Sequence, residues 1–128
     1  MKTLVMKFGG TSVKDINKIK NVASIIKKNY KKYKLVVVLS AMAGATNSLQ
    51  KLINEIDSTS SEENDLIITS GEQVTVGLLS MLLNKMGIKS KPLLGWQVPI
   101  ITDNTAQESK ILNINEKYLI NILKKFDV

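Results

Sequence analysis

The sequence of 128 residues contains no cysteine, no histidine and no arginine, so all 18 basic residues are lysine. Without cysteine or histidine the chain cannot form a disulfide, a Ser-His-Asp or Cys-His catalytic arrangement, or an ordinary zinc, iron or haem site. Without arginine it has no bidentate guanidinium fork for a carboxylate or a phosphate. An anion must therefore be held by lysine ammonium groups, backbone N–H groups, hydroxyls or a metal ion.

Long apolar runs are also missing. No run approaches the ~20 residues of a membrane span, and the apolar residues 4–6 are too few for the core of a signal peptide. The hydrophobic fraction of 44% is nevertheless enough for a core, and the length suits one domain. We therefore expect a single soluble domain over residues 1–128, cytoplasmic and without a membrane partner.

Positive charge is concentrated in the first 34 residues, which hold ten lysines and one acid. A basic arm for nucleic acid is one interpretation. However, most of these lysines share a helical pattern with isoleucine and valine, and the arginine and exposed aromatic residues that contact bases are absent or scarce. A solvated helix face is therefore favoured, and we expect no nucleic-acid partner, with a basic polynucleotide binder kept as a rival hypothesis.

Apolar periodicity and turn residues predict an alternation of strands and helices. The first half is predicted to hold a strand at 3–8, a helix at 16–30 capped by Asp15, a strand at 35–39 buried on both faces and a helix at 49–56. Two successive helices are then expected to start at the capping boxes Ser60–Glu63 and Ser70–Gln73, and the second stops at Gly87. Short strands at 91–94 and 98–102 and a last helix capped by Asn115 follow.

This alternation predicts an α/β domain with a parallel sheet covered on both faces. In such a domain ligands gather at the carboxyl ends of the strands. Three unusual segments fall at these ends or at a helix start: residues 9–12, 40–46 and 70–72. Their coincidence is the main functional indication.

The segment 7–13, KFGGTSV, has two interpretations. Two glycines after a strand allow backbone N–H groups to approach an anion, and Lys7 stands at the same end of the strand. The pattern is not a Walker A loop, in which the lysine follows the glycines. A tight turn with a surface lysine explains the same residues equally well.

The segments 40–47, SAMAGATN, and 70–72, SGE, also have two interpretations. Hydroxyls and N–H groups of the first could bind a small carboxylate, or Thr46 or Asn47 could simply cap a helix. Glu72 could complement a helix dipole in a first helical turn, or pair with the ammonium group of an amino acid. Trp96 is expected to have a packing role rather than to contact a ligand.

Four motifs together resemble the amino-terminal half of an aspartate kinase, within the amino acid kinase family: KFGGTSV, VVVLSAMAGATN, TSGEQV and LLGWQVPIITD. Their order and spacing match across essentially the whole chain, and the first motif separates aspartate kinases from carbamate, acetylglutamate and uridylate kinases. The resemblance implies a three-layer αβα sandwich with a mainly parallel sheet, amino acid kinase-like and incomplete at its carboxyl-terminal side.

The resemblance also implies a reaction, in which ATP and L-aspartate give 4-phospho-L-aspartate, the first step towards lysine, threonine and methionine. Mg²⁺ is carried on the nucleotide, and the chain itself supplies no metal ligand. The catalytic residue is Lys7, which stabilises charge on the transferring phosphoryl group. The residues implied to bind the ATP phosphates are Lys7, Gly9, Gly10, Thr11 and Ser12. Those implied to bind the aspartate are Ser40, Thr46 and Glu72.

In the family the chain continues into a further strand, a glycine-rich loop with an arginine and an aspartate, the adenine pocket and regulatory ACT domains. The resemblance thus implies that residues 1–128 are the amino-terminal portion of an amino acid kinase domain with no ACT domain. We expect a truncated or split aspartate kinase, partnered by a second copy or by a complementing carboxyl-terminal kinase chain. The alternative is a noncatalytic remnant or assembly partner that keeps the fold and associates with another kinase chain.

Overall fold

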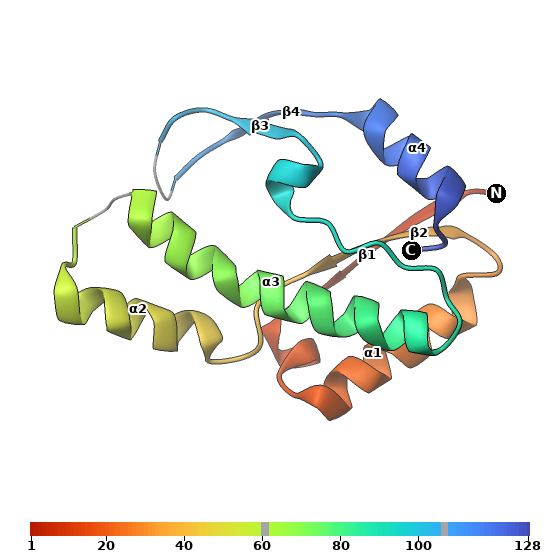
Figure 1. The fold of residues 1–128 in the computed structure, drawn as a ribbon, viewed down its shortest axis with the longest axis horizontal. Helices are drawn as coiled ribbons and strands as arrows, with labels where there is room; N and C mark the ends of the chain where they lie inside the picture. Colours follow the sequence, from red (N-terminus) through yellow and green to blue (C-terminus); the bar gives the residue numbers. More distant parts are fainter. Residues whose placement is uncertain (60–61, 106–107) are drawn as a thin grey trace.

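The computed structural model describes residues 1–59, 62–105 and 108–128 (Figure 1). Its elements are β1 (Thr3–Phe8), the 3-10 turn η1 (Gly10–Val13), α1 (Ile16–Asn29), β2 (Lys34–Leu39), α2 (Ala45–Ile56), α3 (Glu62–Lys85), the 3-10 turn η2 (Gly95–Gln97), β3 (Ile100–Thr102), β4 (Ile111–Ile114) and α4 (Glu116–Lys125). β1 and β2 pair in parallel, with Leu4 opposite Leu35 and Phe8 opposite Leu39. β3 and β4 form a separate antiparallel pair.

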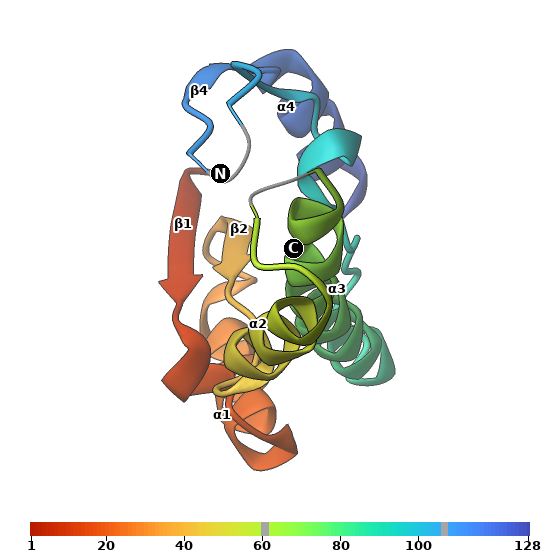
Figure 2. The same cartoon turned by 90° about the vertical axis from the view of Figure 1, so that its left-hand side faces the viewer.

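The core lies between the β1–β2 pair and the helices α1 and α3. Ile19 and Ile26 of α1, Leu35 of β2 and Leu83 of α3 are all at most 1% exposed and belong to one cluster. Figures 1 and 2 show α1 and α3 on one side of the strands, and α4 with β3 and β4 on the other. These three layers confirm the predicted α/β class.

Local sequence signals explain several element boundaries. Asp15 caps α1, because its carboxylate accepts the N–H of Lys18 at 2.8 Å. Asn115 caps α4 in the same way, accepting the N–H of Tyr118 at 3.0 Å. α3 ends at a left-handed Gly87, beyond which the N–H of Ile88 donates to the carbonyl of Leu83 at 3.0 Å. These three predictions are confirmed.

α3 differs from the prediction of two successive helices, because it runs unbroken over 24 residues. Ser70 does not start a second helix. Its hydroxyl donates instead to the carbonyl of Ile67, one turn back at 2.7 Å, which a helix interior accommodates. Ser60 lies outside the described residues, so the structure does not test the predicted capping box Ser60–Glu63.

Further predictions are wrong in whole or in part. No strand forms at 91–94, and the strand predicted at 98–102 is limited to β3. The strand predicted to be buried on both faces, β2, leaves Val38 46% exposed, because the sheet face that carries this side chain is only partly covered. Trp96, for which we expected a packing role, is 63% exposed.

Among the described helices, α3 is long and apolar enough to cross a membrane by length and composition. This is a weak indication, since core helices of soluble proteins meet the same criterion. The apolar composition of α3 has a local cause, because Leu79 and Leu83 pack against the core that α1 and β2 complete. Leu66 and Met81 of the same helix are each 70% exposed.

Candidate active site

The three segments expected to gather a ligand meet around Ala41. The carbonyl of Phe8 accepts the N–H of Ser40 at 3.1 Å, which joins the ends of β1 and β2. A Cβ atom placed on Gly10 would lie 3.0 Å from the carbonyl oxygen of Ala41, and one placed on Gly71 would lie 2.9 Å from the Cβ of Ala41. Glycine therefore permits both the first loop and α3 to approach the loop after β2 this closely.

The first loop is a short turn that leaves its polar groups available. The N–H of Ser12 donates to the carbonyl of Gly9 at 2.9 Å, and the side chains of Thr11 and Ser12 are exposed. Lys7 precedes this turn on β1. Its side chain is exposed, on the sheet face opposite the core, and within the described residues it forms no ion pair.

The second loop begins α2 in a way that the sequence does not reveal. The residue before α2 is Gly44, in the left-handed conformation at φ +83°, and no side chain caps the helix. The capping interpretation of Thr46 and Asn47 is therefore wrong. Thr46 lies in the first turn of α2 with an exposed side chain, and Ser40 is half-buried at the end of β2.

Glu72 connects the third segment to the second. One of its carboxylate oxygens, Oε1, accepts the N–H of Ala41 at 3.3 Å. The other, Oε2, is buried and has no hydrogen-bond partner among the described residues. Glu72 lies in the middle of α3, so the interpretation in which it complements the dipole of a first helical turn is wrong. A buried carboxylate oxygen without a partner is costly, and a bound cationic group would remove that cost.

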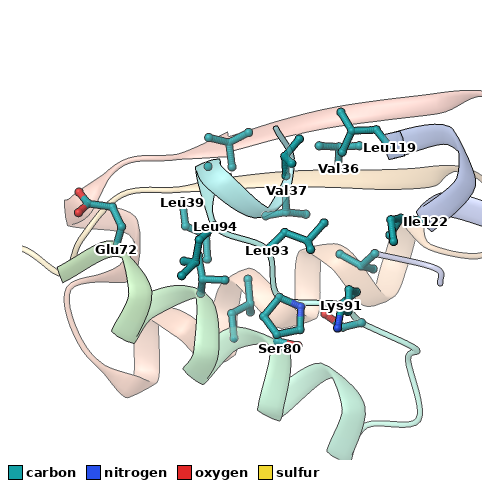
Figure 3. A pocket seen from close by; sticks show the side chains of 18 of the residues that line it. Val36, Val37, Leu39, Glu72, Ser80, Lys91, Leu93, Leu94, Leu119 and Ile122 are labelled. Atoms are coloured by element: carbon teal, nitrogen blue, oxygen red, sulfur yellow. The ribbon is translucent and has the colours of Figure 1, made fainter. Parts of the chain in front are cut away.

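An apolar groove of about 560 Å³ extends away from Glu72 along β2. Figure 3 shows Glu72 and Leu39 near one end of the groove, and Lys91 and Ile122 near the other. The groove is lined by β2, one side of α3, the segment 90–96, and residues of α4. Sequence reasoning missed this groove; its one signal is the continuous apolar run of β2, which is typical of a strand with neighbours on both edges.

The three predicted segments are in contact, but the predicted site residues do not all contact one another. Lys7 and Glu72 form no ion pair, because Lys7 projects from the sheet face opposite the core whereas Glu72 comes from α3. Sequence reasoning also missed Ala41 as the central contact, although its position among small residues is a signal. No group of three or more acidic, histidine or cysteine side chains in the described ranges could hold a metal ion. The site thus offers an ammonium group, backbone N–H groups, hydroxyls and one carboxylate.

Residues 2–128 match the model of the amino acid kinase family, and the chain belongs to this family. Among its relatives, an aspartokinase of Rickettsia felis is 43% identical over 128 residues, covering 93% of this chain and 32% of the relative. An aspartate kinase of Pseudomonas putida is 43% identical over 127 residues, covering 98% of this chain and 31% of the relative. The chain therefore spans about a third of the length of these relatives.

Solved structures give the same result. An aspartate kinase from Synechocystis is 37% identical and aligns with a TM-score of 0.66, covering 70% of this chain and 16% of the other. Aspartokinase III of E. coli, solved in complex with aspartate and ADP, aligns with a TM-score of 0.77 over 98% of this chain and 39% of the other. At 18% identity the second likeness shows the fold alone. The resemblance to aspartate kinases of the amino acid kinase family is confirmed.

Proposed function

We propose that this chain is the amino-terminal portion of an aspartate kinase domain and that it provides the phosphoryl-transfer corner and part of the aspartate pocket. The observation that carries the proposal is the buried Oε2 of Glu72 beside the loop after β2, which has no hydrogen-bond partner within residues 1–59, 62–105 and 108–128. An amino acid is a ligand whose ammonium group would pair with this oxygen. The relatives named aspartokinase support aspartate as that amino acid.

The reaction needs little from the protein beyond position and charge. A side-chain carboxylate oxygen of aspartate attacks the γ-phosphorus of ATP, the bond from that phosphorus to the β,γ-bridging oxygen breaks, and ADP leaves with the electron pair. The attacking carboxylate is already an anion, so no proton has to be removed by a general base. Catalysis then comes from orientation and from neutralising charge on the transferring phosphoryl group.

Each predicted residue has a role in this scheme. Lys7 supplies the positive charge for the phosphoryl group, and the backbone of the turn from Gly9 to Ser12 lines the phosphates. Ser40 and Thr46 contact the aspartate, and Glu72 orients its amino group. Mg²⁺ arrives with ATP as part of the nucleotide substrate. The exposed, unpaired state of Lys7 and the exposed hydroxyls of Thr11 and Ser12 support these roles, since none is committed to a structural contact within the described residues.

The proposed site is partial. The chain contains no arginine that could clamp a carboxylate, and it spans about a third of its relatives. We propose that a complementing carboxyl-terminal kinase chain or a second copy completes the site, in a cytoplasmic setting. The second candidate function is a noncatalytic assembly partner for another kinase chain, which the shortness relative to the aspartokinases favours.

Substrate binding tests the role of Glu72 without requiring turnover. Aspartate is expected to shift the NMR signal of the Ala41 amide, whose hydrogen is bonded to Glu72, whereas succinate, which lacks the ammonium group, is expected to bind at least ~10-fold more weakly. Glu72→Gln should abolish this preference for aspartate, and Glu55→Gln, on the exposed surface of α2, should keep it. Equal binding of the two ligands by the unaltered chain would refute the proposed role.

Turnover separates the two candidate functions. ATP-dependent formation of aspartyl hydroxamate by the purified chain is measured beside Lys7→Ala and Lys2→Ala, which alter lysines near opposite ends of β1. Activity that is lost only in Lys7→Ala establishes a working kinase with Lys7 in the proposed role. No activity of the unaltered chain above a reaction without protein establishes that the chain alone is noncatalytic, whereas activity of the unaltered chain that Lys7→Ala retains contradicts the role of Lys7.

A further inference from the structure

The side of α3 that carries Gly71 packs directly against the loop after β2. Gly71 is buried, and a Cβ atom placed on it would lie 2.9 Å from the Cβ of Ala41, closer than two such carbon atoms approach. The next atoms would be the Cδ1 of Leu49 at 3.7 Å and the Cβ of Ala45 at 3.8 Å, which are ordinary contact distances. Of these three neighbours, only Ala41 forbids a side chain at position 71.

The helix itself does not require glycine at position 71. α3 runs unbroken through this position, and the glycines with a left-handed backbone are Gly44 and Gly87. Glycine is also among the least favourable residues in a helix interior. The same turn is held by Thr75, which is fully buried and whose hydroxyl donates to the carbonyl of Gly71 at 3.2 Å. The close approach to Ala41 therefore explains this glycine better than local structure does.

The residue that follows Gly71 is the acid of the candidate site. The Oε1 atom of Glu72 accepts the N–H of Ala41 at 3.3 Å, so the residue that limits position 71 also supplies the donor to Glu72. This distance is already beyond the range of about 2.7–3.2 Å that is usual for an N–H···O hydrogen bond. A shift of α3 away from the loop by a few tenths of an ångström would therefore break the bond.

The hydrogen bond from Ala41 decides how Glu72 presents its second oxygen. Because Oε1 is held by the N–H of Ala41, Oε2 is the oxygen left for a ligand, and it is buried without a partner in the described ranges of the chain. A carboxylate released from Ala41 could rotate about its side-chain bonds and turn to water. Its orientation towards a ligand would then have to be restored at each binding event, at a cost in affinity.

We propose that Gly71 is a positioning residue of the candidate site. Because it carries no side chain, α3 lies close enough to the loop for the N–H of Ala41 to hold Oε1 of Glu72 and to leave Oε2 for an ammonium group. Recognition of the ammonium group rests on the proposed function, whereas the contact between Gly71 and Ala41 does not. Displacement of α3 should therefore weaken the binding of a ligand that has an ammonium group and spare one that lacks it.

The binding of aspartate and of succinate to single variants separates positioning from general stability. Gly71→Ala should weaken aspartate binding at least ~3-fold and change succinate binding by less than ~2-fold, because succinate has no ammonium group to lose. Gly77→Ala, in the same helix, adds a Cβ that meets nothing within 4 Å and should change neither affinity. Ala41→Gly keeps the N–H that Glu72 accepts and should keep the preference for aspartate.

The double variant Gly71→Ala/Ala41→Gly is the sharpest test. It moves one methyl group from position 41 to position 71, so the volume of the pair is conserved and α3 can return to the loop. We expect the double variant to recover the aspartate affinity of the parent chain to within ~2-fold, a coupling that two independent sites would not show. The proposal is overturned if the double variant binds aspartate as weakly as Gly71→Ala, or if Gly71→Ala loses aspartate and succinate affinity equally.

NMR spectra without any ligand test the positioning directly. The unaltered chain should show a nuclear Overhauser effect between the methyl protons of Ala41 and the α protons of Gly71, and its absence overturns the proposal. The carboxylate carbon signal of Glu72, assigned by its loss in Glu72→Gln, should move in Gly71→Ala and return in the double variant. If Gly71→Ala does not fold, a folded double variant with the parent position of this signal supports the proposal, and a displaced signal overturns it.

The two sets of measurements distinguish failure of the positioning role from failure of the proposed function. If the unaltered chain binds aspartate and succinate equally, the proposed function is refuted, and the carboxylate signal still decides whether Gly71 positions Glu72. If aspartate is preferred and Gly71→Ala keeps the full preference, the role of Glu72 stands and the role of Gly71 is overturned.

Discussion

Gly10 is a residue at which the candidate site tolerates little change. A Cβ atom there would meet the backbone carbonyl of Ala41 at 3.0 Å, whereas one on Gly9 would meet nothing within 4 Å. Because a backbone atom cannot rotate away, Gly10→Ala should force the two loops apart and lower the free energy of unfolding by ~1–3 kcal/mol. Gly9→Ala, at an ordinary φ of −76°, should stay within ~0.5 kcal/mol of the parent chain.

Urea unfolding of the two variants, followed by circular dichroism, measures this difference. The weaker aspartate binding expected of a displaced loop should accompany the destabilisation in Gly10→Ala. Equal unfolding midpoints for the two variants would mean that the loops are not in contact in solution.

At the scale of single residues, the sequence predicts which segments form the candidate site, but it does not predict which atoms of those segments are in contact. The glycine pair, the loop after β2 and Glu72 can all be singled out from residue type and spacing. That Gly10 rather than Gly9 makes the close approach depends on the register that joins Phe8 to Ser40, which a sequence does not display. The same limit hides the role of Ala41, whose importance is its backbone N–H rather than its side chain.

At the scale of elements, α3 contains a matched pair of glycines with opposite expected effects. A Cβ on Gly71 would lie 2.9 Å from the Cβ of Ala41, whereas one on Gly77 would meet nothing within 4 Å. Gly71→Ala should therefore destabilise the chain by ~1–3 kcal/mol through overpacking. Gly77→Ala should stabilise it by ~0.5–1 kcal/mol, because alanine favours a helix over glycine.

Thermal unfolding of the two single variants gives the sign of each effect. A melting temperature raised by Gly77→Ala and lowered by Gly71→Ala is the expected pair of results. If both variants raised it, the contact between α3 and the loop after β2 would contribute nothing to stability.

Elements with strong local signals are predicted well, and those that need distant partners are not. β1, α1, β2 and the stop at Gly87 follow from apolar periodicity, caps and glycine. The strand predicted at 91–94 fails because Pro92 has no N–H to donate and the described partner of this stretch is the short tail at Val128. The unbroken course of α3 overrides a capping signal at Ser70, since packing against α1, α2 and β2 favours one long helix.

For the molecule as a whole, the lysine-rich surface allows a test of the rival hypothesis of polynucleotide binding. Five lysines in this region are exposed: Lys14, which precedes the cap of α1, and Lys18, Lys20, Lys27 and Lys28 of α1. The sequence has few aromatic residues to stack on bases, and we expect at most weak binding that disappears between low and physiological salt. The fluorescence anisotropy of a labelled oligonucleotide measures it, and tight binding that persists at 0.15 M salt would revive the nucleic-acid hypothesis.

The class and the family of the whole molecule are predicted correctly from sequence, because alternating apolar segments and four ordered motifs are properties of the chain itself. The resemblance also implies a sheet that is incomplete on one side, but the groove itself is not predicted, since its shape depends on how β2, α3 and α4 pack in the described structure. Composition indicates how much apolar surface a chain can bury, but it does not indicate which apolar surface stays exposed after folding.

The contact between β2 and the tail has a consequence for the order of folding. The ammonium group of Lys34 donates to the carbonyl of Phe126 at 3.1 Å, across a sequence separation of 92 residues. The same group lies 3.8 Å from the carboxylate of Asp127. β1 and β2 pair across a separation about a third as long, so closing the tail onto β2 costs ~1 kcal/mol more in loop entropy.

In kinetic terms, β1, α1 and β2 can associate as soon as they leave the ribosome, whereas residues 126–128 are synthesised after the other described elements and their contact with β2 closes a long loop. Among the described contacts, the one between β2 and residues 126–127 is thus one of the last to form and, being partly exposed, one of the first to open.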